Sequence, residues 1–258
     1  SAAQMSRRMS SGRHPVRAIF MREWRIMNRT PIFLLNGVLV VIIVPVVFVL
    51  MATMGSGRGD TAAVMKVMTS GNSFYVTLAA AAFMTACGSL NGTASSTFSR
   101  EGGQFWISRV IPVAPRDQIA AKFLHSYLIS GLGVVAASVV SVLVLHLKAG
   151  VLAAAIALAL LVSIPLDAAG MIIDLARPLL DWTNPQKAIK QNLNVLLAVF
   201  ADIGILTSFF FLLKLLIKSG LAGTSALAIL FAMLVALSVL SWRFLIGFAD
   251  RRYREIET

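Results

Sequence analysis

Six long apolar segments account for most of this 258-residue chain. Each is long enough to cross the hydrocarbon core of a bilayer, which is about 30 Å thick and requires ~20 helical residues. The lipid interior has no water to hydrogen-bond exposed peptide groups, so such segments are helices and not open sheets. We therefore predict an all-α membrane protein with six transmembrane helices. The predicted spans are 31–53, 74–97, 123–147, 151–173, 194–217 and 223–248.

The distribution of basic residues indicates how these spans are oriented. The chain has 23 lysine and arginine residues against 11 acidic ones, a formal net charge of +12. Eighteen of the 23 lie before the first span, in the connections 98–122 and 174–193, or near the C-terminal end. Since positive residues stay cytoplasmic during insertion, both termini are predicted to be cytoplasmic. The basic excess then reports topology and attraction to anionic lipid, and nucleic acid is not an expected partner.

The sequence divides into four regions. Residues 1–14 are rich in serine and arginine and are predicted to form a flexible basic linker. Residues 15–30 place apolar side chains and arginines on different helix faces, which is typical of an amphipathic helix in the headgroup region with Trp24 as an anchor. The alternative for this segment is a solvated helix packed on a cytoplasmic domain. Residues 31–250 form the transmembrane domain, and 251–258 form a cytoplasmic tail.

Small residues and prolines predict details of helix packing. Spans two and three are rich in glycine, alanine and serine, which let helix backbones approach closely in lipid. Pro45 is expected to kink span one. The short link around Ala149 predicts that spans three and four form a tight antiparallel hairpin.

The chain lacks the motifs of common enzyme and cofactor sites. It has no G-x-x-x-x-G-K-[ST] loop to hold ATP phosphates. Its histidines (His14, His125 and His146) are scattered and its one cysteine, Cys87, lies inside a span, so no metal-binding cluster is predicted. No serine or cysteine has a recognisable base beside it. We expect neither catalysis nor a cofactor bound by this chain.

The connection 98–122 is too polar to span a membrane, yet it has an apolar centre. Its large apolar side chains are Phe105, Trp106, Ile107, Val110 and Ile111. Gly102 and Gly103 are expected to break the preceding helix, and Pro112 and Pro115 to form a turn before span three. An apolar element at the cytoplasmic face predicts a docking surface for a partner. A helix lying in the headgroups is the alternative.

The second informative segment runs from Asp174 to Asn194. Trp182 is expected at the membrane interface, and Lys187, Lys190 and Asn194 are expected along one helical face.

Two acidic residues are predicted to lie within the membrane. Asp167 and Asp202 are roughly 12–15 Å from the cytoplasmic ends of their spans at 1.5 Å per residue. A carboxylate at that depth costs at least ~2.5 kcal/mol and should face protein or water. Asp174 is two turns from Asp167, so the three can share one acidic locus. This locus makes a proton- or cation-coupled secondary transporter one hypothesis; hydrogen bonding across helices is the purely structural alternative.

The two cytoplasmic segments resemble those of one known family. The sequence S-R-E-G-x-x-F-W followed by I-P-V is similar to the cytoplasmic loop of bacterial ABC exporter permeases, and D-L-x-R-P-x-L-x-W-x-N-P…K-Q-N-x-N is similar to a second signature of one group of them. Members of that group are roughly twice as long. Because Glu23-Trp24-Arg25…Arg29-Thr30-Pro31 resembles the start of their second half, the chain looks like a C-terminal six-helix half.

The resemblance implies a permease in a bacterial cytoplasmic membrane that works with a separate ATP-binding subunit and a second permease half or copy. ATP and Mg²⁺ are then expected on the partner. The family's short coupling helix corresponds by position to Glu101–Arg116. The implied coupling residues are Glu101, Phe105, Trp106, Arg109 and Arg116, with Arg177, Trp182, Lys187 and Lys190 in the second loop. The remaining hypothesis is a membrane scaffold with no transport path.

Overall fold

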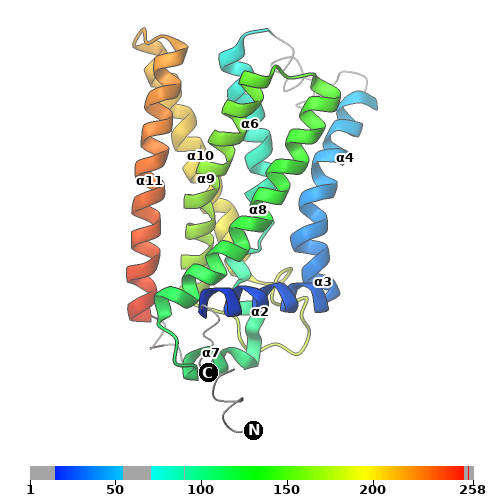
Figure 1. Ribbon diagram of the computed structural model, residues 1–258, viewed down its shortest axis with the longest axis vertical. Coiled ribbons are helices and arrows are strands. Elements are labelled where there is room, and N and C mark those ends of the chain that lie inside the picture. The colour runs from blue at the N-terminus through cyan, green and yellow to red at the C-terminus, as the bar shows by residue number, and fades with distance from the viewer. Residues whose placement is uncertain (1–14, 55–70, 90, 253–254, 256–258) are drawn as a thin grey trace, which may run out of the picture.

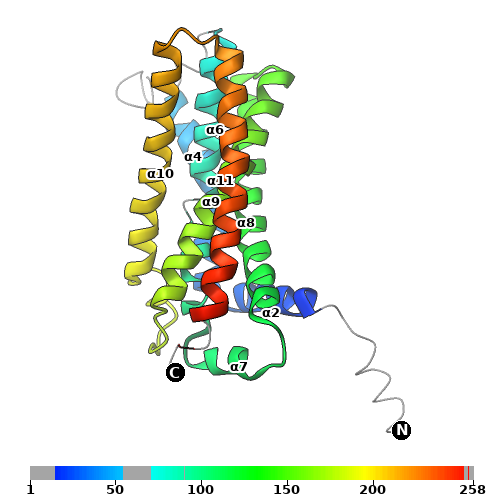
Figure 2. The ribbon, with the colours of Figure 1, turned by 90° about the vertical axis from the view of Figure 1, so that its left-hand side faces the viewer.

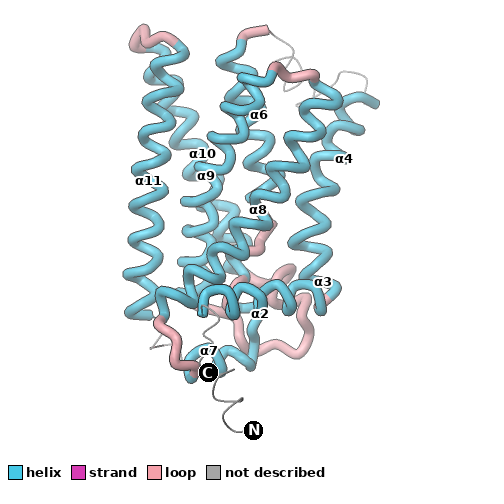
Figure 3. The backbone as a smooth tube through the Cα atoms, viewed as in Figure 1, coloured by secondary structure: helices cyan, strands magenta, loops and turns pink. Residues whose placement is uncertain are grey.

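The computed structural model describes residues 15–54, 71–89, 91–252 and 255, and the regular elements in these ranges are all helices (Figures 1 and 3). Six helical segments are long and apolar enough to cross a membrane. The predicted all-α membrane architecture is therefore confirmed for the described residues. The predicted linker 1–14 and most of the tail 251–258 lie outside them.

The six spans follow one another along the chain. The first is made of α3 (Pro31–Leu34), the π-helical turn η1 (Leu35–Leu39) and α4 (Val40–Met54). The others are α6 (Ser73–Ser89), α8 (Pro115–Leu145), α9 (Ala149–Ala176), α10 (Leu193–Lys218) and α11 (Gly223–Arg252). The shorter helices are α2 (Pro15–Arg29), η2 (Ala94–Ser96), η3 (Ser99–Gln104) and α7 (Phe105–Val110).

Span two covers Ser73–Ser96, close to the predicted 74–97, but it is not one continuous α-helix. Its α-helix ends at Ser89, and the chain continues through Gly92, whose φ is +71°, into the 3₁₀ turn η2. The side chain of Asn91 donates to the carbonyl of Gly88 at 2.5 Å and accepts from the amide of Thr93 at 2.8 Å. These local bonds compete with the α-helical pattern, which explains why the predicted span 74–97 is not one α-helix.

Small residues bring α6 and α8 into close contact, as their frequency in spans two and three predicts. A Cβ atom on Gly133 would lie 2.6 Å from the carbonyl oxygen of Cys87, and one on Gly88 would lie 2.5 Å from that of Ser130. Only glycine at these positions allows the two backbones this separation. The apolar core formed here also includes residues of α9, which packs against both α6 and α11.

Helix α2 lies across one end of the bundle, nearly perpendicular to the spans (Figure 1). It buries Ile19, Glu23 and Met27, which recur every four residues, and it packs against α8. Trp24 contacts the ring of His125 edge-on, with 6.0 Å between centroids. Helix α7 and the end of α11 lie at the same end, and α7 lies beyond α2 (Figure 2). This end, which holds both predicted cytoplasmic segments, is called the basic end below.

Candidate functional site

Helix α7 has one buried and one exposed face. Phe105 and Ser108 are fully buried, and the Phe105 ring meets Phe98 edge-on at 6.3 Å between centroids. On the other face Trp106 is 53% exposed and Val110 is 72% exposed. A helix this short is not stable by itself, so the packing of its buried face must stabilise it. Its apolar outer face remains available to a partner.

Two of the residues expected in the coupling set, Phe105 and Glu101, face the interior of the chain. Phe105 belongs to the core formed with residues of α8, α9 and α11, and Glu101 is 5% exposed. The Phe105 ring, predicted to contact a partner, is instead enclosed by this chain, and Glu101, expected among the coupling residues, is enclosed as well. Trp106, Arg109 and Arg116 are exposed. Arg116 also lies 3.7 Å from the carboxylate of Asp117.

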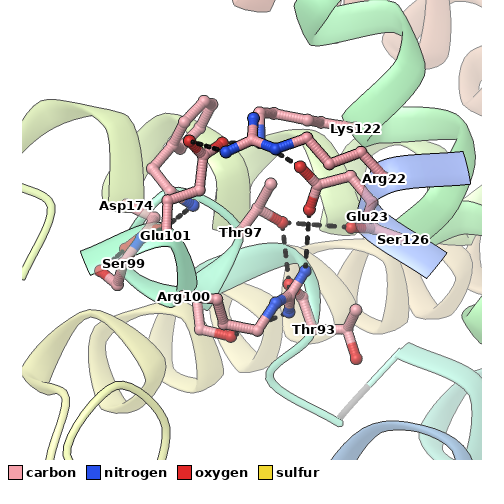
Figure 4. Close-up of polar contacts among 12 residues, drawn as sticks. Arg22, Glu23, Thr93, Thr97, Ser99, Arg100, Glu101, Lys122, Ser126 and Asp174 are labelled. Atoms are coloured by element: carbon pink, nitrogen blue, oxygen red, sulfur yellow. Dashed lines mark hydrogen bonds and ion pairs between the residues drawn. The ribbon is translucent and has the colours of Figure 1, made fainter. Parts of the chain in front are cut away.

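A buried group of charges connects the segment before α7 to two other helices (Figure 4). The ammonium group of Lys122, on α8, donates to Glu23 of α2 at 2.5 Å and also to Glu101 of η3. All three side chains are almost fully buried. Hydrogen-bonded ion pairs of this kind hold their elements in a fixed arrangement, since a buried charge left alone is costly.

Ser108 connects α7 to the same group. Its hydroxyl donates to Glu101 at 2.5 Å and accepts from Arg22 at 2.7 Å, while Arg22 also donates to Glu101 at 3.2 Å. The amide of Gln118 on α8 donates to the Ser108 carbonyl at 2.9 Å. The hydrogen bonds of Ser108 and the packing of the Phe105 ring, both on the buried face of α7, thus fix this helix against the bundle.

Arg100 is a second buried cation of the group. One guanidinium nitrogen, Nη1, donates to the Thr93 carbonyl at 2.7 Å and to Ser96 at 3.2 Å. The other, Nη2, has no hydrogen-bond partner and lies 4.0 Å from Glu23. Burial lowers the pKa of Arg100 from its ordinary value, and the carboxylates of Glu23, Asp174 and Glu101 oppose that shift.

Asp174 joins the two segments that the sequence singled out. Its carboxylate accepts the backbone amides of Phe98 and Ser99 at 2.7 and 3.0 Å, the Ser99 hydroxyl, and the side-chain amide of Asn194 at 3.0 Å. Asn194 donates to the carbonyl of Arg177 at 2.9 Å as well. Asp174 therefore holds the start of η3 to α9 and α10.

Trp182 packs on η3, the segment that precedes α7. Its indole nitrogen donates to the Ser99 carbonyl at 2.7 Å, and a Cβ atom on Gly102 would lie 2.8 Å from the indole ring. Residues 185–191 form turns in which Lys187 and Lys190 are exposed, whereas Asn194 is buried. The predicted helical face shared by Lys187, Lys190 and Asn194 is therefore wrong. Arg177, which is exposed, engages Asn194 only through its backbone.

The other two membrane-embedded carboxylates line one small cavity. Asp167 and Asp202 are 3% and 5% exposed, and the cavity between them has a volume of about 10 Å³, close to that of a single water site. Asp167 accepts from Ser130 at 3.0 Å, whereas one oxygen of Asp202 has no partner. Asp174 does not line this cavity, so the predicted locus contains two carboxylates instead of three.

Sequence reasoning assigned no role to Glu23, Lys122, Ser108 or Gln118. A signal existed for Glu23, because it is the sole acidic residue among the first 59. An isolated carboxylate on the apolar side of an arginine-rich helix indicates a buried ion pair. Ser108 and Gln118 carry no such signal, since their bonds depend on how α7 folds against α8.

Comparison of the chain with known protein families, curated proteins and solved structures finds no match.

Proposed function

We propose that this chain is the permease component of an ATP-driven ABC transporter, an exporter, and that the segment 99–110 couples it to a separate ATP-binding subunit. One observation carries the proposal. A short helix with an exposed apolar face, formed by Trp106, Ile107 and Val110, is fixed at the tip of the basic end. Exposed aromatic and aliphatic side chains beside arginine are typical of interface anchors.

The way α7 is anchored supports a coupling role. A displacement of α7 acts on Glu101 through Ser108, and from Glu101 on α8 and α2 through Lys122 and Glu23. Through η3 it also acts on Asp174, at the ends of α9 and α10. A partner that closes on α7 would thereby move four helices of the bundle together.

The other components follow from what the chain contains. It has no phosphate-binding loop, so ATP and Mg²⁺ belong to the partner. The excess of basic residues at the end that holds α7 supports a cytoplasmic position for that end, on the side where an ATP-binding subunit would work. The bacterial cytoplasmic membrane belongs to the proposal because the family resemblance implies it. A second permease half or copy completes the transport path.

The test is retention of the ATP-binding subunit during mild-detergent purification from the native host. Trp106→Ala/Val110→Ala should insert normally and lose the subunit, because an anchor residue contributes of the order of 2 kcal/mol or more. Phe211→Ala is the control, since Phe211 is 61% exposed on α10, outside α7. Equal retention by both variants, with transport unchanged, would contradict the proposal.

The cavity between Asp167 and Asp202 favours a second candidate, a cation-coupled secondary transporter. It adjoins the break in span two, since Gly92 and Ser95 also line it. Unwound helices beside membrane carboxylates are typical of ion sites in such transporters. Transport by the purified chain in liposomes under a pH gradient, abolished by Asp202→Asn, would select this candidate over the first.

A further inference from the structure

A groove opens at the basic end between α2 and the segment 99–110, which is called the coupling segment below. It has a volume of about 580 Å³, within the usual range for small-molecule sites. Four arginines line it, Arg22, Arg25 and Arg29 from α2 and Arg100 from η3. Glu101 also lines it, but its carboxylate is already bonded to Lys122, Arg22 and Ser108.

The arginines in the groove have unused bonding capacity. Arg100 is 3% exposed, and its Nη2 group, which lies 4.0 Å from the Glu23 carboxylate, has no hydrogen-bond partner. Arg25 and Arg29 form no ion pair with any residue in the described part of the chain. A buried donor without a partner is costly, and a bound anion would satisfy it.

We propose that this groove binds the phosphate group of an anionic phospholipid, with Arg25, Arg29 and Arg100 as its donors. The planar guanidinium matches phosphate oxygens in pairs, and donors from two different elements can surround one group. The inference depends on membrane insertion only, and does not require the ATP-binding partner.

Two observations favour a lipid over a soluble anion. The groove lies at the junction of α2 with the first span, because Thr30 and Phe33 line it too, and this is the level at which headgroups meet the helix ends. Its walls are partly apolar, since Ile26, Phe33 and Trp182 accompany the arginines. A phosphate with attached acyl chains fits such a lining, whereas a free ion leaves the apolar wall without a contact.

The experiment is a lipid titration of the purified full chain in detergent, followed by native mass spectrometry. Phosphatidylglycerol should be retained in preference to phosphatidylcholine. Arg25→Gln/Arg29→Gln should weaken phosphatidylglycerol retention by about tenfold or more, since each arginine near an anionic lipid contributes several-fold. Arg17→Gln/Lys187→Gln removes the same charge from exposed positions outside the groove and should have a much smaller effect. Thermal unfolding of each variant verifies that the fold is retained.

Each of the following outcomes would contradict the inference. Equal retention of the two lipids, or equal weakening by the two double variants, would reduce the effect to general surface charge. Displacement of the lipid by inorganic phosphate at a matching concentration would make a soluble anion the ligand. Displacement by a hexaglutamate peptide, with no preference for phosphatidylglycerol, would make an acidic protein segment the occupant.

Discussion

At the residue scale, the basic end is organised around a balanced set of charges, all of them buried except Arg22, whose side chain is 29% exposed. Arg22, Arg100 and Lys122 provide three positive groups, and Glu23, Glu101 and Asp174 provide three negative ones. Lys122 is central because it alone bonds two carboxylates, from α2 and from η3. A buried group of paired charges adds little net stability compared with apolar residues of similar volume. Removing one charged side chain is costly, however, because it leaves its partner charge buried and unpaired.

Lys122→Met should therefore destabilise the protein strongly. The change leaves Glu23 and Glu101 facing each other without their shared cation, a situation that typically costs about 3–5 kcal/mol. Arg116→Gln breaks only the exposed pair with Asp117 and should change stability little. Denaturant unfolding in detergent micelles measures both. Equal stability of the two variants would show that the buried group does not hold the basic end together.

Gly102→Ala should lower the stability of the protein by straining η3, whereas Gly103→Ala should leave the stability unchanged. Gly102 has φ +54° and ψ −138°, a region that other residues rarely occupy, and an added Cβ would meet Trp182. Nothing lies within 4 Å of a Cβ on Gly103. We expect a loss of about 1–3 kcal/mol for the first change and none for the second. Thermal unfolding checks the loss, and an unaltered Gly102→Ala protein would contradict the contact with Trp182.

At the element scale, the sequence predicts helices better than it predicts their ends. Apolar length identifies every span, since lipid leaves the backbone no alternative to a helix. The end of α6 at Ser89 was missed because a span predicted from its length and composition does not show where Asn91 and Gly92 change the backbone. The orientation of α7 was missed because it depends on Phe98 and Lys122 in other elements, which no local pattern reveals.

Gly133→Ala tests the close crossing of α6 and α8. Its Cβ would lie 2.6 Å from backbone atoms of Cys87 and Gly88, so the helices must separate, at about 1–3 kcal/mol. Gly131→Ala is the matched control on the same helix, because its nearest neighbour would be Leu160 at 4.0 Å. Unfolding in detergent should separate the two variants. If both are equally stable, the helices do not approach as closely as the structure has them.

At the scale of the whole molecule, the end of the bundle where the basic residues gather is also the end where the cytoplasmic segments predicted from the sequence lie. The helix α2, the coupling segment and the end of α11 are all at the basic end, as spans with both termini on one side require (Figure 1). The sequence alone predicted this clustering through its positive residues. It could not predict the groove or the cavity between Asp167 and Asp202, because each is formed by elements distant in the chain.

Cysteine labelling tests the predicted orientation. Ser219→Cys lies in the connection between α10 and α11 and should react with a membrane-impermeant maleimide on intact cells. Gln104→Cys, which is exposed at the basic end, should react only after permeabilisation. Native Cys87 is 4% exposed and provides the unlabelled background. The predicted second external site, Gly57, lies outside the described residues. External labelling of Gln104→Cys would reverse the orientation.

Site-specific photo-cross-linking at α7 tests the coupling proposal most directly. A photoreactive amino acid is placed at Trp106, which is exposed, and in a second protein at Phe105, which is buried. In the native host the label at position 106 should cross-link to an ATP-binding protein, and the label at position 105 should react only within the chain. Cross-linking of position 106 to lipid alone would make α7 a membrane-surface helix and contradict the proposal.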